Sequence, residues 1–189
     1  MAEYFFVKIH SFLKRIRSIF FFFAYGVRFK IVGTKLKIRG VKYFSVESNV
    51  SIGDFCWVEC ISSYLNFSYN PVLRISDNVA MSDFVHISCS KSIVIEKNVL
   101  IGSKVYIGDH SHGYGPNQEG KGPANLPLIN LDDVYIGEST WIGDGVVILA
   151  GTHLNAHSVI VANSVVKNLR TNKPAIIGGS PAKIIKYLG

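Results

Sequence analysis

Cysteine is scarce in this sequence, and its scarcity excludes folds that are stabilised by a cysteine-bound metal or by a set of disulfides. The 189 residues include only three cysteines, Cys56, Cys60 and Cys89. Their spacing matches no metal-binding motif, and three cysteines form no even-numbered disulfide framework. We therefore interpret them as small buried hydrophobic residues of a protein in a reducing cytosol.

Acidic residues are also few. Asp and Glu number 13 against 20 Lys and Arg, which gives a formal net charge of +7. A net positive charge of this kind favours binding to nucleic acid, to a membrane surface or to an anionic cofactor. Basic residues interleaved with aromatics, which are typical of nucleic-acid binding, are absent. Because the positive charge gathers toward the two ends, we expect a membrane surface as the N-terminal partner, an anionic ligand near the C-terminus, and no nucleic acid.

Apolar runs long enough to cross a bilayer are missing as well. The run at residues 19–25 is far shorter than the roughly 20 residues that a membrane-spanning helix needs, and no small-residue cleavage site follows it, so we expect no signal peptide. It ends a basic amphipathic segment, which predicts a helix over residues 1–26. Two roles stay open for this helix: contact with a membrane surface, or a cap whose apolar face covers the open end of the fold.

A six-residue repeat dominates the rest of the chain. Large aliphatic residues recur at every sixth position, at Ile136, Ile142, Ile148, Leu154 and Ile160. The same spacing occurs upstream within residues 75–87 and 95–107. A period of six fits neither a helix nor an alternating strand, but it fits a parallel β-helix in which each hexapeptide is a short strand and a turn. We predict an all-β domain over residues 27–189, with one large interruption at 112–133 and a short helix near residues 182–188.

Paired histidines stand where the repeat breaks. Residues 107–114 read IGDHSHGY, and a stretch rich in Gly, Pro and Asn follows, which indicates a loop leaving the coil. A long loop beside His110 and His112 is a candidate functional site, because histidine is the natural general base near neutral pH.

Several motifs carry a family resemblance. They are DHSHG before the loop, VYIGESTWIGDGVVILAGT after it, VIVANSVVKN, and the terminal GGSPAKIIK. With them the chain resembles the hexapeptide-repeat acyltransferases, in the maltose/galactoside O-acetyltransferase-like branch, close to the enzymes that O-acetylate lipopolysaccharide or capsular polysaccharide. The resemblance implies a left-handed β-helix, a homotrimer with active sites between neighbouring prisms, and acetyl-CoA as co-substrate without a metal. The cysteine usage and the basic N-terminal segment together predict a cytoplasmic protein, which the N-terminal helix would hold peripherally at the inner membrane.

The resemblance also assigns a catalytic base. The family's histidine occupies the sixth position of the hexad before the loop, and counting from Ile107 places His112 there, with His110 as an accessory. The base would remove a proton from a hydroxyl of a sugar or lipid-linked oligosaccharide, which attacks the thioester directly. Asp109 and Glu119 are both candidates to orient the imidazole.

Other site residues follow from the same motifs. The expected cofactor-binding residues lie after the loop: Trp141, Gly143, Asp144, Ala162, Lys167, Asn168, Lys183 and Lys186. The two C-terminal lysines would meet the phosphates of coenzyme A. The residues expected near the acceptor sugar are Ser82, Asp83, Ser90 and Asp109.

Three alternatives remain open at the level of sequence. The first is an N-acetyltransferase acting on an amino or nucleotide sugar. The second is a zinc enzyme of the γ-carbonic-anhydrase kind, with His86, His110 and His112 as ligands, although an i, i+2 pair with one distant histidine is poor ligand geometry. The third is a non-catalytic β-helical scaffold, which would have no need of the DHSHG loop or the SPAK ending.

Overall fold

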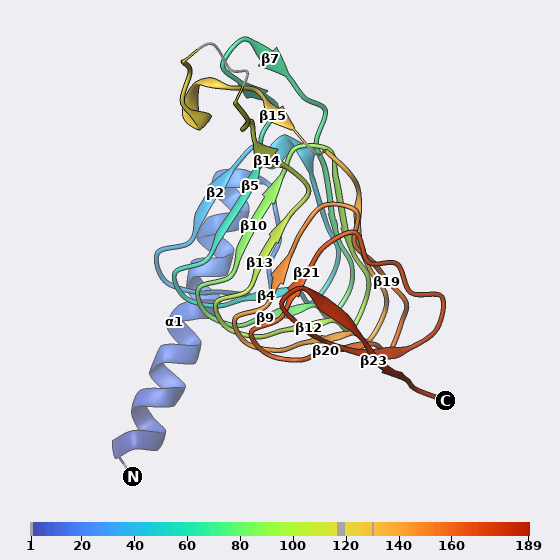
Figure 1. Cartoon of the computed structure of the whole chain (residues 1–189). Coiled ribbons are helices and arrows are strands. Elements are labelled where there is room, and N and C mark those ends of the chain that lie inside the picture. Colours follow the sequence, from blue (N-terminus) through green and yellow to red (C-terminus); the bar gives the residue numbers. More distant parts are fainter. Residues whose placement is uncertain (1, 117–119, 130) are drawn as a thin grey trace.

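Short strands wind around one buried core in three sheets. The computed structural model describes residues 2–116, 120–129 and 131–189. Figure 1 looks along the stack of coils, and each turn of the chain passes through all three sheets. The strands of neighbouring turns pair in parallel, as a β-helix requires, so the predicted β-helix is confirmed.

Sheet A forms one side of the coil stack. Its eight strands, in order of pairing, are β1 (Ile31–Val32), β4 (Ser51–Ile52), β9 (Ala80–Met81), β12 (Leu100–Ile101), β17 (Trp141–Ile142), β20 (Val159–Ile160), β22 (Ala175–Gly179) and β23 (Ala182–Tyr187).

Sheets B and C complete the triangle. Sheet B contains β2 (Lys37–Arg39), β5 (Trp57–Cys60), β10 (His86–Cys89), β13 (Tyr106–Gly108), β18 (Val147–Ile148) and β21 (Val165–Val166). Sheet C contains β3 (Phe44–Val46), β8 (Val72–Ile75), β11 (Ser92–Ile95), β16 (Val134–Ile136) and β19 (His153–Leu154). A short 3₁₀ helix, η1 (Val41–Tyr43), precedes β3.

The hexapeptide aliphatics form the core as predicted. Ile142 pairs in register with Ile101 on one side and Ile160 on the other, and all three side chains are buried. Residues of the intervening turns, such as Asn98 and Asn163, adopt positive φ, which asparagine tolerates better than most residues. Each hexapeptide thus supplies one aliphatic residue to the buried core and one turn to a corner of the coil.

The predicted C-terminal helix is wrong. Residues Ala182–Tyr187 form β23, which pairs antiparallel with β22. The side chains of Ala182 and Ile184 pack partly against the core while Lys183 and Ile185 are exposed, and this alternation is that of a strand.

The prediction of a single interruption is also wrong. The loop excursion at 112–133 is present, and its described part holds β14 (Ser111–His112), η2 (Pro123–Asn125) and β15 (Leu128–Ile129). A second excursion, the hairpin of β6 (Ser63–Tyr64) and β7 (Phe67–Ser68), leaves the coil between β5 and β8. Figure 1 shows both excursions rising from the same corner.

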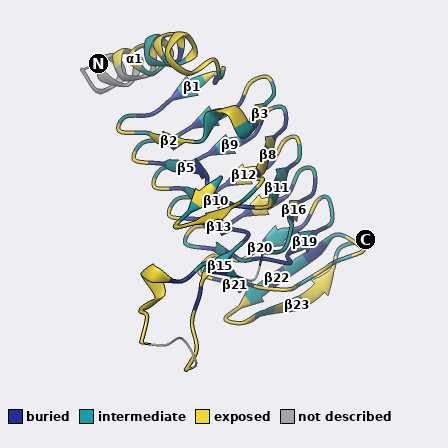
Figure 2. Ribbon diagram, turned by 90° about the horizontal axis from the view of Figure 1, so that it is seen from above, coloured by how far each residue is buried: buried dark blue, intermediate teal, exposed yellow. Residues whose placement is uncertain are grey.

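The N-terminal segment forms helix α1 (Ala2–Tyr25), which packs on the first coil beside β1. From Phe12 onward its outer side is largely exposed (Figure 2). No helix among the described residues is long and apolar enough to cross a membrane.

Candidate functional site

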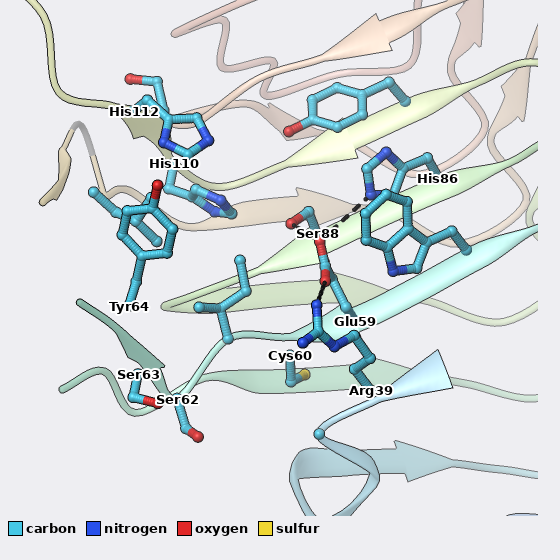
Figure 3. A pocket seen from close by; sticks show the side chains of 16 residues that line it. Arg39, Glu59, Cys60, Ser62, Ser63, Tyr64, His86, Ser88, His110 and His112 are labelled. Carbon is cyan, nitrogen blue, oxygen red and sulfur yellow. Dashed lines mark hydrogen bonds and ion pairs between the residues drawn. The ribbon is translucent and has the colours of Figure 1, made fainter. Parts of the chain in front are cut away.

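A pocket of about 620 Å³ opens on the outer face of sheet B, below the two excursions. Its wall is built from β5, β10 and β13, and its rim from β6, β14 and Leu128 of β15. Figure 3 shows the charged and imidazole side chains that line it. The pocket contains both histidines of the DHSHG motif.

Asp109 holds His110 at the edge of this pocket. Its carboxylate is fully buried and accepts backbone N–H groups from Ser90 (2.8 Å), Lys91 (2.7 Å) and Ser92 (2.8 Å). The Nδ1 atom of His110 lies 2.8 Å from Oδ1 of Asp109. The carboxylate therefore fixes Nδ1 of the imidazole, and Nε2 is the ring nitrogen that Asp109 does not bind.

The buried carboxylate stays ionised near neutral pH. Burial alone would raise the pKa of Asp109, but hydrogen bonds from His110 and from the backbone N–H groups of Lys91 and Ser90 outweigh it and hold the pKa below its ordinary value. An ionised carboxylate on Nδ1 favours the tautomer with the proton on that atom, and Nε2 is then free to accept a proton.

Ser90 also contacts the imidazole. Its hydroxyl lies 3.1 Å from Nδ1 of His110, and the residue is buried. The sequence predicted Ser90 at the acceptor sugar; in the structure it lies behind the histidine and beside Asp109.

His112 has a different environment. It lies on β14, opposite Leu128 in an antiparallel pair, and its side chain is exposed. The ring of Tyr64 meets it edge-on, with centroids 5.3 Å apart. Within the described part of the chain, His112 forms no ion pair with a carboxylate. Its ring is therefore fixed by fewer contacts than the ring of His110.

A second polar ladder crosses the floor of the pocket. Arg39, Glu59 and Ser88 occupy paired positions on neighbouring strands of sheet B. The hydroxyl of Ser88 donates to Oε1 of Glu59 at 3.0 Å, and Nε2 of His86 lies 3.6 Å from the same oxygen (Figure 3). The sequence analysis did not identify Glu59, because a single glutamate within a strand carries no pattern.

Glu59 is also held in its charged form. Burial would raise its pKa, while His86, Ser88 and then Arg39 lower it, and the net pKa lies below the ordinary value. The pocket therefore combines the ionised carboxylate of Glu59 with three imidazoles, a guanidinium and hydroxyl groups, and the second ionised carboxylate, Asp109, is buried behind His110.

Three of the eight expected cofactor residues lie on another face. Trp141 pairs with Val159, and Val159 with Ile176, so their side chains share the outer face of sheet A. Lys186 pairs with Ile176 and Lys183 with Gly178. A β-bulge between them places both lysines on this same face, although a spacing of three would separate them in a regular strand.

The five other expected cofactor residues lie at corners of the coil. Gly143 and Asp144 follow β17, where Oδ1 of Asp144 accepts the N–H of Ser103 at 2.6 Å, and Ala162 is exposed on the next coil. Lys167 and Asn168 follow β21 and lie outside the face of sheet A.

None of the four expected acceptor residues lines the pocket, since Ser90 and Asp109 are buried behind His110. Ser82 and Asp83 follow β9 at another corner, where Oδ1 of Asp83 accepts the N–H of Asp54 at 2.7 Å. Glu119, the second candidate to orient the imidazole, lies outside the described residues.

The three histidines of the zinc alternative form no ligand cluster within one chain. His86 stacks on Trp57 with ring centroids 4.4 Å apart, while His110 is bound to Asp109. Across residues 2–116, 120–129 and 131–189, no group of three or more His, Cys, Asp or Glu side chains is arranged to hold a metal ion.

Comparison with known proteins agrees with the repeat. Residues 133–168 match the family model described as bacterial transferase hexapeptide (six repeats). WbbJ of Escherichia coli, provisionally named a lipopolysaccharide biosynthesis O-acetyl transferase, is 39% identical over 119 residues, which cover 61% of this chain and 60% of WbbJ. The chain thus spans less than two thirds of the length of the curated relatives that it matches first.

Two solved structures share the fold. A mutant of AntD, an N-acyltransferase from Bacillus cereus in complex with dTDP and coenzyme A, superposes with a TM-score of 0.62 at 16% identity over 82% of each chain. The hexapeptide-repeat containing acetyltransferase VCA0836 from Vibrio cholerae gives a TM-score of 0.51 at 22% identity, over 97% of this chain and 86% of that one. At these identities the likeness concerns the fold alone.

Proposed function

We propose, from the bacterial transferase hexapeptide repeat that residues 133–168 match, that this chain is an acetyl-CoA-dependent O-acetyltransferase. It moves an acetyl group to a sugar hydroxyl in the biosynthesis of a surface polysaccharide, the O-antigen of lipopolysaccharide or a capsule. The likeness to WbbJ supports the acceptor class. The observation that carries the proposal is the Asp109–His110 pair at the pocket of sheet B.

The proposed reaction needs one base and no covalent enzyme intermediate. Nε2 of His110 takes the proton of the acceptor hydroxyl as its oxygen attacks the thioester carbonyl of acetyl-CoA. The tetrahedral intermediate collapses, the C–S bond breaks, and the imidazolium returns the proton to the thiolate of coenzyme A. Asp109 stabilises the imidazolium, as a buried carboxylate does in other histidine-dependent sites.

In this proposal the roles predicted for the two histidines are exchanged. His110 is the base, because a buried carboxylate fixes its Nδ1 atom and its side chain is only 7% exposed. His112 is an accessory at the rim, where its ring contacts Tyr64. Ser90 becomes a positioning residue for His110.

We propose that the outer face of sheet A binds acetyl-CoA. Trp141 packs along the pantetheine arm, Lys183 and Lys186 meet the phosphates, and a backbone amide near Gly143 stabilises the oxyanion. Ala162, Asp144, Lys167 and Asn168 remain predicted contacts of the cofactor.

A neighbouring subunit would complete the site. His110 lies at the pocket of sheet B and the proposed cofactor residues lie on sheet A, two different sides of one triangular coil. We propose a left-handed β-helix that assembles as a homotrimer, in which sheet A of one subunit faces the pocket of the next. Ser82 and Asp83, which lie away from the pocket of their own chain, would then serve an acceptor in another subunit's site. The assembly would act in the cytoplasm, at the inner face of the membrane.

An assay of coenzyme A release tests the function. The purified full chain, acetyl-CoA and a thiol reagent are combined with a panel of sugars and lipid-linked oligosaccharides, and with amino sugars as a separate arm. We expect release above the acceptor-free rate with hydroxyl acceptors, and much less with the His110→Ala variant. Transfer only to amino sugars would replace the O-acetyl proposal with the N-acetyl alternative, and no transfer to any acceptor would contradict both.

A further inference from the structure

Helix α1 carries its apolar side chains on the side that faces away from the coil. Phe12, Ile16, Ile19, Phe20 and Phe23 follow one another at helical spacing and form a single stripe. Phe12 is 62% exposed and Phe23 is 80% exposed. We call these five residues the apolar stripe. The apolar face that the sequence predicted therefore lies away from the coil, while Phe21 on the other side of the helix packs against the core.

Polar side chains attach the helix to the coil together with Phe21, whose ring centroid lies 5.7 Å from that of Phe29. Lys14 forms an ion pair with Asp54 at 3.1 Å, Arg17 donates to the carbonyl of Val32 at 3.0 Å, and Ser18 donates to the carbonyl of Phe29 at 2.6 Å. These contacts fix the rotation of α1 about its axis. The apolar stripe is thus presented outward by specific contacts and is not the result of a helix lying free of the protein.

A cationic groove runs beside the apolar stripe. It measures about 960 Å³ and lies between α1 and the first coil, with Ile19, Phe22 and Phe23 on one wall. Three cations line it, Arg15, Arg28 and Lys30, and none of them forms an ion pair with a described carboxylate. Its one acidic residue, Glu47, pairs with Arg74 at 3.2 Å. The groove therefore has unbalanced positive charge directly beside exposed aromatic rings.

We propose that α1 lies in the interface of an anionic bilayer, with the apolar stripe among the acyl chains and the cationic groove on lipid phosphates. Both parts match the two layers of such an interface, where phosphates lie directly above hydrocarbon. A second protein surface would have to supply an apolar patch and a separate cluster of acids in the same arrangement. The inference needs no acetyl transfer, and it stands or falls independently of the proposed reaction.

Flotation of the full-length protein with vesicles tests this inference. Vesicles of phosphatidylcholine alone are compared with vesicles that also contain phosphatidylglycerol, at two salt concentrations. We expect binding to the anionic vesicles that weakens with salt. The triple variant Arg15→Gln/Arg28→Gln/Lys30→Gln should bind about 100-fold more weakly, at about fivefold for each cation near the surface. The double variant Phe12→Ser/Phe23→Ser should lose binding to the anionic vesicles at both salt concentrations.

Two matched controls make the test specific. The variant Lys35→Gln/Lys104→Gln/Lys173→Gln removes the same charge from exposed positions outside the groove, and Phe67→Ser removes an exposed aromatic ring from the β6–β7 hairpin. Both should bind anionic vesicles nearly as well as the unchanged protein. Equal losses in the groove variant and its lysine control would overturn the phosphate site. If Phe12→Ser/Phe23→Ser changes the oligomeric state in solution and leaves vesicle binding intact, the stripe contacts a second copy of the chain and the inference is wrong.

Discussion

At the scale of single residues, Asp109 links the stability of the fold to the geometry of the site. Its pKa is lower in the folded chain than its ordinary value. A carboxyl group of this kind contributes stability that is fully present above its unfolded pKa, about 3.9, and that is lost as pH falls through the lower folded pKa. The contribution therefore disappears only in acid.

Replacing this carboxylate should change both acid stability and turnover. We expect Asp109→Asn to show a flatter loss of unfolding free energy below about pH 4 than the unchanged protein, measured by urea unfolding from pH 3 to pH 7. At neutral pH, kcat should fall by about 10²–10⁴-fold, because the imidazole loses its orienting partner. If the unfolding free energy falls equally steeply below about pH 4 in both proteins, the assignment of this pKa shift to Asp109 is contradicted.

Gly143 illustrates how closely neighbouring coils approach. A Cβ atom at this position would lie 2.7 Å from the backbone nitrogen of Ala162 and 2.9 Å from the carbonyl oxygen of Ile160. Gly143→Ala should therefore cost about 1–3 kcal/mol of unfolding free energy through overpacking, measured by urea unfolding. Gly122→Ala is the control, because no atom lies within 4 Å of its Cβ position. Equal stability of the two variants would show that the neighbouring coils shift enough at this corner to accommodate the added methyl group.

The residue scale also shows what a sequence can and cannot reveal about the site. The DHSHG motif was sufficient to locate the two histidines, since it breaks the hexad repeat. The role of each histidine depends on Asp109 being buried against the turn at residues 90–92, a contact between residues about 20 positions apart. Glu59 and Ser88, 29 positions apart, meet only because the coil brings their strands together.

At the scale of elements, the periodicity predicted the regular strands well and the irregular elements poorly. Ile142 and its equivalents were identified because stacking requires the same residue type in every coil. β23 was mistaken for a helix because a short basic and apolar segment fits either structure. The β6–β7 hairpin was missed because it lies between two correctly phased coils and disturbs neither.

Two tyrosines join the hairpin region to the loop excursion. The hydroxyl of Tyr64 donates to the carbonyl of Ala124 at 2.7 Å, and the hydroxyl of Tyr69 accepts the N–H of Leu128 at 3.0 Å. Each hydrogen bond contributes about 1 kcal/mol, so Tyr64→Phe/Tyr69→Phe should speed trypsin cleavage after Lys121 about 30-fold. Tyr187→Phe on β23 serves as the control. Unchanged cleavage of the double variant would mean that other contacts hold the excursion.

The bulged strand β23 supplies the predicted phosphate contacts of coenzyme A. Because the bulge turns Lys183 and Lys186 to one face, their joint replacement by Gln should raise the KM for acetyl-CoA about tenfold or more and leave kcat nearly unchanged, as expected for lost charge-assisted contacts to a bound ligand. Lys173→Gln is the matched control. A fall in kcat at constant KM would place these lysines elsewhere than at the cofactor.

At the scale of the whole molecule, three surfaces of the coil stack carry three different sets of side chains. The pocket of sheet B holds the charged groups and His110, the outer face of sheet A holds Trp141 and the two lysines of β23, and α1 presents the apolar stripe at the end where the chain enters the first coil (Figure 2). In the proposed trimer the first two surfaces meet between subunits. The membrane contact would then bring three such sites close to a lipid-linked acceptor.

Steady-state acetyl transfer by His110→Ala and His112→Ala tests the central claim most directly. Each variant is first shown to keep the melting temperature and the oligomeric state of the unchanged protein. We predict that His110→Ala loses about 10²–10⁴-fold in kcat, the range for loss of a general base, with little change in the KM for acetyl-CoA, and that His112→Ala loses much less. An inactive His112→Ala beside an active His110→Ala would contradict the assignment of the base, and two variants with unchanged rates would contradict the mechanism itself.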